Sequence, residues 1–321
     1  AEVSLNLLIL ILLGLFMASY AAMRVLSATF GLPKRVREYR TRQRRDKAGL
    51  VFQDAVRLLF EGRFGQAMKK AAEAHGAGTA PGLSALIAAR AAQRMREPAK
   101  QQYWLEHART DDPRTEAATL MLDAEMANEE RRFDVALAAL EKLQGKQGRH
   151  IAALRLELRA RQGAGDWDGV IKLVRQLAKR DALPDEVVRE ILTQAHLACI
   201  AKRSGDERQL ISYLRSLPGE ERGRRVVLAA ARALSAQGAD GEAQKLIESA
   251  LDAAGDEAWQ TDLLAIYGRL THGEQTARIA KAEAWLRRHP DDALLLMALG
   301  RMCQRQRLWG KAQSYLEASL S

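Results

Sequence analysis

Four arginines stand at a fixed distance before a position that repeats along the chain, and their chemistry suits carboxylate binding. Each arginine precedes its repeat position by 11 residues, in the pairs Arg90 and Gln101, Arg159 and Val170, Arg232 and Ala243, and Arg301 and Ala312. A guanidinium can hold a carboxylate through two parallel hydrogen bonds. The series could therefore bind the carboxylates of an acidic peptide or of a small ligand. The alternative is that these arginines are simply solvated.

Other residue types that support catalysis or metal binding show no recognisable spacing. The sequence has no GxGxxG, GxxxxGK[ST], GxSxG or HExxH pattern, so we predict no enzyme activity, no catalytic residues and no metal site. We expect the six histidines to be solvated or turn residues: His75, His107, His150, His196, His272 and His289. Cys199 and Cys303 are predicted to be reduced thiols on helices. No cofactor is evident, although heme or porphyrin binding by a histidine or cysteine stays open.

The amino-terminal region holds the elements that would place these residues at a membrane. The run from Val3 to Met23 contains no charged residue. As a helix it would span roughly 31 Å, which matches the hydrocarbon core of a bilayer. A cleaved signal peptide is the alternative, but such peptides carry their basic flank before a shorter apolar core. We therefore predict a transmembrane helix over residues 3–32.

The positive charge of the chain is concentrated directly after this run. Residues 34–47 include eight basic and two acidic residues, a net charge of +6 out of the total of +10. Residues 33–47 are thus a basic juxtamembrane segment, which places the rest of the chain on the cytoplasmic side and argues against a nucleic-acid partner. The membrane-flanking basic residues are Arg24, Lys34, Arg35, Arg37, Arg40, Arg42, Arg44, Arg45 and Lys47.

An internal repeat covers the remaining residues, 48–321. The repeat position recurs at residues 67, 101, 136, 170, 209, 243, 277 and 312, so the gaps are 34, 35, 34, 39, 34, 34 and 35 residues. An aromatic residue stands three residues before four of these positions: Phe64, Phe133, Trp167 and Trp309. This period resembles the tetratricopeptide repeat (TPR), in which two short helices form a hairpin. We predict an all-α fold with a TPR-like α-solenoid of about eight helical hairpins, and an insertion near residues 181–186.

The order of these segments resembles the HemY-type proteins of bacterial inner membranes. The closest resemblance lies in WLRRHPDDALLLMALGRMCQRQRLWGKAQSYLEASLS, residues 285–321. That family is associated with late steps of heme (protoporphyrin) biosynthesis and is regarded as a TPR scaffold or regulator without catalytic residues. Its members have two membrane segments near the amino terminus and extend past the point where this sequence ends. We therefore expect the sequence to be part of a longer chain.

The resemblance implies a membrane-anchored TPR-like scaffold or regulator of late heme biosynthesis, which acts through protein–protein interaction. Its expected partners are late heme-pathway enzymes. It would lie at the bacterial inner membrane with its repeat domain facing the cytoplasm, and the four arginines would line the concave, partner-binding face of the repeats. The alternatives are a TPR scaffold for envelope assembly (lipopolysaccharide or secretion) and a porphyrin-binding carrier. We also expect self-association through apolar residues near the carboxyl end, Tyr315, Leu316 and Leu320.

Overall fold

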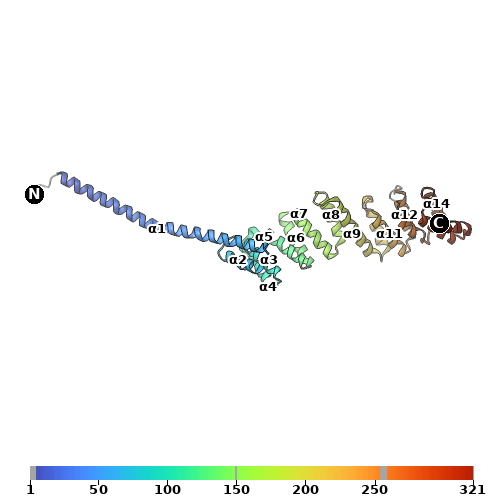
Figure 1. Ribbon diagram of the computed structural model, residues 1–321, viewed down its shortest axis with the longest axis horizontal. Coiled ribbons are helices and arrows are strands. Elements are labelled where there is room, and N and C mark those ends of the chain that lie inside the picture. Colours follow the sequence, from blue (N-terminus) through green and yellow to red (C-terminus); the bar gives the residue numbers. More distant parts are fainter. Residues whose placement is uncertain (1–4, 149, 254–258, 321) are drawn as a thin grey trace. The chain divides into compact units, whose positions relative to one another are not determined.

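The regular elements of the protein are helices (Figure 1). The computed structural model describes residues 5–148, 150–253 and 259–320. Within these ranges, it does not describe the side chains of residues 5–7, 25–42, 44, 45 and 147. In these ranges no strand is present, so the predicted all-α fold is confirmed. The chain divides into two compact units, an amino-terminal unit (Ala1–Gly148) and a carboxyl-terminal unit (Arg149–Ser321).

The amino-terminal unit consists of helices that pack in consecutive pairs. Helix α1 packs against α2, α3 against α4, and α5 against α6. The elements are α1 (Leu5–Phe60), α2 (Phe64–Gly76), α3 (Pro81–Arg94), α4 (Pro98–Asp111), the short 3₁₀ helix η1 (Pro113–Thr115), α5 (Glu116–Glu129) and α6 (Phe133–Gln147).

In the carboxyl-terminal unit, from α7 to α16, most helices pack against the next helix along the chain. Its elements are α7 (Ile151–Ala164), α8 (Trp167–Ala178), α9 (Asp185–Arg203), α10 (Glu207–Ser216), the 3₁₀ helix η2 (Gly219–Glu221), α11 (Arg224–Ala236), α12 (Asp240–Ala253), α13 (Thr261–Tyr267), α14 (Gln275–Leu286), α15 (Ala293–Arg305) and α16 (Trp309–Ala318). A large core runs through this unit from Ile200 to Ala312 and includes the buried Trp285.

Each repeat position of the sequence lies near the start of the second helix of a hairpin. Phe64, Phe133, Trp167 and Trp309 are the first residues of α2, α6, α8 and α16. The small residue three positions later is buried in each case, as Ala67, Ala136, Val170 and Ala312. A small buried side chain at this point lets the first helix approach closely, because there is little volume between the two backbones. The period of the sequence is thus the period of the hairpins.

The two repeats with glutamine at the repeat position also form hairpins. Gln101 lies in the first turn of α4 and is buried, with its amide nitrogen donating to a carboxylate oxygen of Glu130 at 3.1 Å. Gln209 occupies the same place in α10. The longer gap before Gln209 is absorbed largely by α9, which has 19 residues where α11 has 13. The insertion therefore lengthens a first helix, α9.

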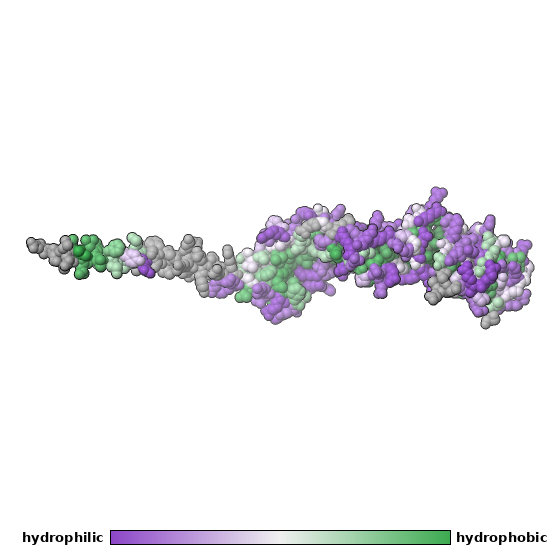
Figure 2. Space-filling view, turned by 90° about the horizontal axis from the view of Figure 1, so that it is seen from above, coloured by the Kyte–Doolittle hydropathy of each residue, from purple (hydrophilic) through white to green (hydrophobic). Residues whose placement is uncertain are grey.

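Helix α1 is continuous from Leu5 to Phe60, across both predicted boundaries at residues 32/33 and 47/48. Near its carboxyl end, Ala55 and Leu58 are buried against residues of α2 and α3. Earlier, the apolar side chains from Leu8 to Met23 are exposed, and Figure 2 shows a hydrophobic surface on this stretch. Within the described residues, none of the helices combines the length and apolar character needed to cross a bilayer.

The predicted membrane helix, residues 3–32, extends beyond the residues whose side chains are described, and it stays a prediction. Of the predicted membrane-flanking residues, the side chains of Arg24 and Lys47 are described, and both are exposed. The others lie outside the described side chains: Lys34, Arg35, Arg37, Arg40, Arg42, Arg44 and Arg45.

Candidate functional site

The first helices of consecutive hairpins lie beside one another in the carboxyl-terminal unit. Helix α9 packs against α11, α11 against α13, and α13 against α15. Of the second helices, α12 packs mainly on α11 and α16 on α15, whereas α14 packs on α15, the first helix of the next hairpin. The first helices therefore form one layer, and the side chains on its outer face are available to a partner.

Two of the predicted arginines are exposed on first helices of the carboxyl-terminal unit. Arg159 on α7 and Arg232 on α11 both face solvent. Within the described part of this unit, neither guanidinium makes a hydrogen bond or an ion pair. Arg301 on α15 is half-buried and lies near Arg305. Burial lowers the pKa of Arg305, and the positive charges of Arg278 and Arg301 lower it further.

The fourth predicted arginine, Arg90 on α3, is paired within its own unit. Its guanidinium donates to Glu125 at 3.2 Å and to Glu129 at 2.9 Å, both on α5. The side chain of Arg90 is 16% exposed. Glu125 occupies in the next hairpin the place that Arg90 occupies in its own, so the pair joins equivalent positions of two repeats. This contact gives Arg90 a role in packing that does not need a partner protein.

A groove of about 820 Å³ lies beside the same layer, between α8, α9 and η2. Its charged walls carry both signs, with Arg175, Lys179 and Arg189 among the bases. The apolar and acidic residues that complete it are Val188, Leu192, Pro218, Asp185, Glu220 and Glu221. The groove thus offers apolar contacts together with charges of both signs.

A hydrogen-bonded network fixes the shape of this groove. Glu221 accepts two bonds from Arg175, at 2.8 and 2.5 Å, and one from His196 at 2.8 Å. The other ring nitrogen of His196 is 2.7 Å from the hydroxyl oxygen of Tyr213. The prediction that the histidines are solvated is wrong for His196, because its side chain is only 1% exposed.

Burial sets the protonation of this network. It lowers the pKa of His196, despite the neighbouring Glu221 that would raise it. Burial alone would raise the pKa of Glu221, but the hydrogen bonds from Arg175 and His196 outweigh it and leave this pKa below its usual value. At neutral pH the network therefore holds a carboxylate, a guanidinium and a neutral imidazole.

The remaining aromatic and sulfur side chains have structural environments. Trp285 is buried in the core, as expected for packing between repeats, whereas Trp309 is 63% exposed and does not fill such a place. His289 stacks on Trp259, with ring centroids 4.0 Å apart. Both cysteines are buried and free, and burial raises the pKa of each thiol. Such thiols are protonated and poorly reactive.

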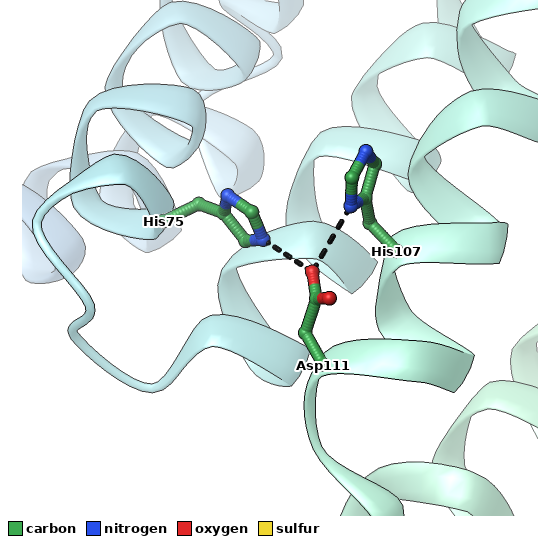
Figure 3. Close-up of side chains that lie close together, drawn as sticks. All are labelled: His75, His107 and Asp111. Atoms are coloured by element: carbon green, nitrogen blue, oxygen red, sulfur yellow. Dashed lines mark hydrogen bonds and ion pairs between the residues drawn. The ribbon is translucent and has the colours of Figure 1, made fainter.

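Three side chains from two helices form a group of the kind that binds metal ions. His75 from α2, and His107 and Asp111 from α4, converge with their ligand atoms within 4.8 Å of one another (Figure 3). The sequence offered one signal for this group, because His107 and Asp111 are four residues apart and share a helix face. His75 is 32 residues before His107, so only the packing of the hairpins brings it there. The prediction of solvated histidines without ligand spacing thus missed this cluster.

The fold and these surfaces define an all-helical repeat protein built from helical hairpins of about 34 residues. Residues 1–96 match the family model described as "HemY protein N-terminus". The resemblance to the HemY-type proteins is therefore confirmed over this part of the chain. Among solved structures, the chain is similar to the TPR domain of P58(IPK), with 12% identity over 85% of this chain and 92% of that one, at a TM-score of 0.28. No curated protein matches the sequence.

Proposed function

We propose that this protein is a membrane-anchored scaffold or regulator of late heme (porphyrin) biosynthesis that acts by binding other proteins. The observation that carries this proposal is the match of residues 1–96 to the HemY amino-terminal region, since HemY-type proteins are associated with that pathway. The helical hairpins support the binding role, because repeats of this kind commonly present an extended surface to protein partners.

The exposed apolar side chains of α1 support an inner-membrane location. Eleven large apolar residues between Leu8 and Met23 are exposed to solvent on this helix. Moving one such side chain out of water contributes about 1.5–3 kcal/mol, so their transfer into lipid is strongly favourable together. The basic residues that follow, from Lys34 to Lys47, suit the cytoplasmic surface of a bilayer. This orientation would place the hairpins in the cytoplasm.

The layer of first helices supplies the proposed partner-binding surface. Arg232 is exposed on this layer, on α11, and Arg159 is exposed on the earlier first helix α7. Both can bind carboxylates of a partner protein through charge-assisted hydrogen bonds. The groove beside η2 offers apolar contacts within the same unit. Late heme-pathway enzymes are the partners that the family match favours.

Porphyrin analysis of cells that lack the protein tests this function. We expect intermediates of the late pathway to accumulate, and the wild-type chain to restore the normal profile. A chain without residues 1–47 should not restore it, because it is no longer held at the membrane. An unchanged porphyrin profile with altered lipopolysaccharide or secretion would instead favour the envelope-assembly scaffold. A Soret shift on mixing the purified protein with porphyrin would favour the carrier.

A further inference from the structure

The group formed by His75, His107 and Asp111 joins two neighbouring hairpins of the amino-terminal unit. His75 lies in the last turn of α2, and Asp111 is the final residue of α4. His75 Nε2 is 2.8 Å and His107 Nδ1 is 3.0 Å from the same oxygen, Oδ2 of Asp111. One carboxylate oxygen thus already joins the two imidazoles across the hairpins.

The distances suit a small transition-metal ion. A tetrahedral ion with bonds of about 2.0–2.1 Å holds its ligand atoms about 3.3 Å apart. The two N···O separations in the structure are 2.8 and 3.0 Å, and the two histidine nitrogens lie within 4.8 Å of each other. Small rotations of the side chains would therefore admit an ion between the three atoms. Two imidazoles and one carboxylate are a ligand set that favours zinc and its neighbours over magnesium or calcium, which prefer oxygen ligands.

The surroundings hold these ligands in place without closing the site. The Thr110 hydroxyl lies 3.1 Å from the other carboxylate oxygen of Asp111 and 3.1 Å from the backbone oxygen of Glu106, so its single proton can support that ligand or bond to the helix. Trp104 and Tyr103 meet the rings of His75 and His107 edge-on, at centroid distances of 5.4 and 4.5 Å. The side chains of His75, His107 and Asp111 are 20%, 34% and 31% exposed, respectively. Water or a small ligand can therefore reach the position where the three ligand atoms converge.

We propose that His75, His107 and Asp111 bind a divalent transition-metal ion of the Zn²⁺ class, which links α2 to α4 and keeps a coordination position open to solvent. Such an ion would stabilise the contact between two hairpins, since it binds the folded arrangement and not the separated helices. The open position gives the site the capacity to bind a further ligand.

Titration of the full chain, purified in detergent and freed of metal, tests this site. We expect calorimetry to show one Zn²⁺ bound per chain, and excess Mg²⁺ to leave it bound. Co²⁺ should give the visible absorption bands of an ion with few ligands. Zn²⁺ at about a hundred times its Kd should raise the Tm of the amino-terminal unit by about 5–10 °C.

Variants assign the binding to these residues. His107→Gln and Asp111→Asn should each weaken Zn²⁺ binding by about 100-fold or more, and Thr110→Val by about 10-fold. His272→Gln is the matched control, because its side chain lies in the other unit and is 78% exposed. Circular dichroism would show whether each variant folds, and Thr110→Val leaves all three ligands in place. Absent Zn²⁺ binding by the wild type, or binding that Asp111→Asn, His107→Gln and Thr110→Val leave unchanged, would overturn the proposal.

Discussion

Replacing Gly268 with alanine should separate two first helices of the carboxyl-terminal unit. Gly268 directly follows α13 as its C-cap, with φ −64°, a conformation that alanine adopts freely, so any cost comes from packing. A Cβ atom there would lie 2.8 Å from Cα and 2.9 Å from Cβ of Ala298 on α15, whereas ordinary contact begins near 3.4 Å. The difference between 3.4 and 2.8 Å, about 0.6 Å, must come from movement of α15, because the atoms that clash are backbone and Cβ.

Overpacking of this kind costs about 1–3 kcal/mol. The matched change Gly241→Ala, in the first turn of α12, has nothing within 4 Å of the added atom. It should leave the stability unchanged or raise it by up to about 0.5 kcal/mol, since alanine favours helix more than glycine does but a helix end uses less of that difference than a helix interior. Gly300→Ala should fall between the two, because the added atom meets the side chain of Leu316, which can rotate.

Urea unfolding followed by tryptophan fluorescence measures these differences, since Trp285 is buried in the same core. With a slope of about 2 kcal/mol per molar urea, a loss of about 2 kcal/mol lowers the midpoint by about 1 M. A midpoint for Gly268→Ala equal to that of the wild type would refute the close approach of α13 and α15. A lower midpoint for Gly241→Ala would show that the absence of atoms within 4 Å does not make this glycine a suitable control.

Three further predictions concern the hydrogen-bonded network around His196, the proposed membrane anchor and the exposed carboxyl-terminal helix α16. Because burial lowers the pKa of His196 from its usual 6.5, the unfolded chain binds more protons below that pH. The urea midpoint of unfolding should therefore decrease as the pH is lowered from 7 to 5. In His196→Asn the midpoint should depend less steeply on pH; an unchanged pH dependence would count against a buried neutral imidazole. A chain without residues 1–47 should leave the membrane fraction and keep its helical circular dichroism, because Ala55 and Leu58 still pack on α2; continued membrane association would contradict the anchor. Trp309 and Leu320 are exposed on and beside α16, so Trp309→Gln with Leu320→Glu should reduce self-association in analytical ultracentrifugation, while Gln313→Glu should not; equal association in both would exclude this surface.

The hairpins could be predicted from the sequence because their signal is local and repeated. An aromatic first residue and a small buried residue three positions later mark a helix that must lie close to its predecessor, as at Phe133 and Ala136. Gln101 shows where the pattern weakens without loss of the fold, because its buried amide bonds to Glu130 instead of packing as alanine does.

The side-chain partners could not be predicted, because they come from other helices. Arg90 was identified by its spacing, but its pairing with Glu125 and Glu129 depends on how α3 lies against α5. His196 is surrounded by residues from α8, α10 and η2, so its burial has no local signal. The proximity of His75 to His107 likewise depends on how the hairpins pack. The four-residue spacing of His107 and Asp111, in contrast, could have suggested two of the three ligands from the sequence.

Affinity purification of the full chain from native membranes tests the scaffold function most directly. The arginine surface provides a paired comparison: Arg159→Glu with Arg232→Glu reverses charge on the first helices, and Arg208→Glu does so on α10, also at an exposed position. We predict that late heme-pathway enzymes co-elute with the wild type and with Arg208→Glu, and that the double variant loses them. Co-elution of lipopolysaccharide or secretion proteins instead, or of no protein in any of the three, would contradict a heme-pathway scaffold.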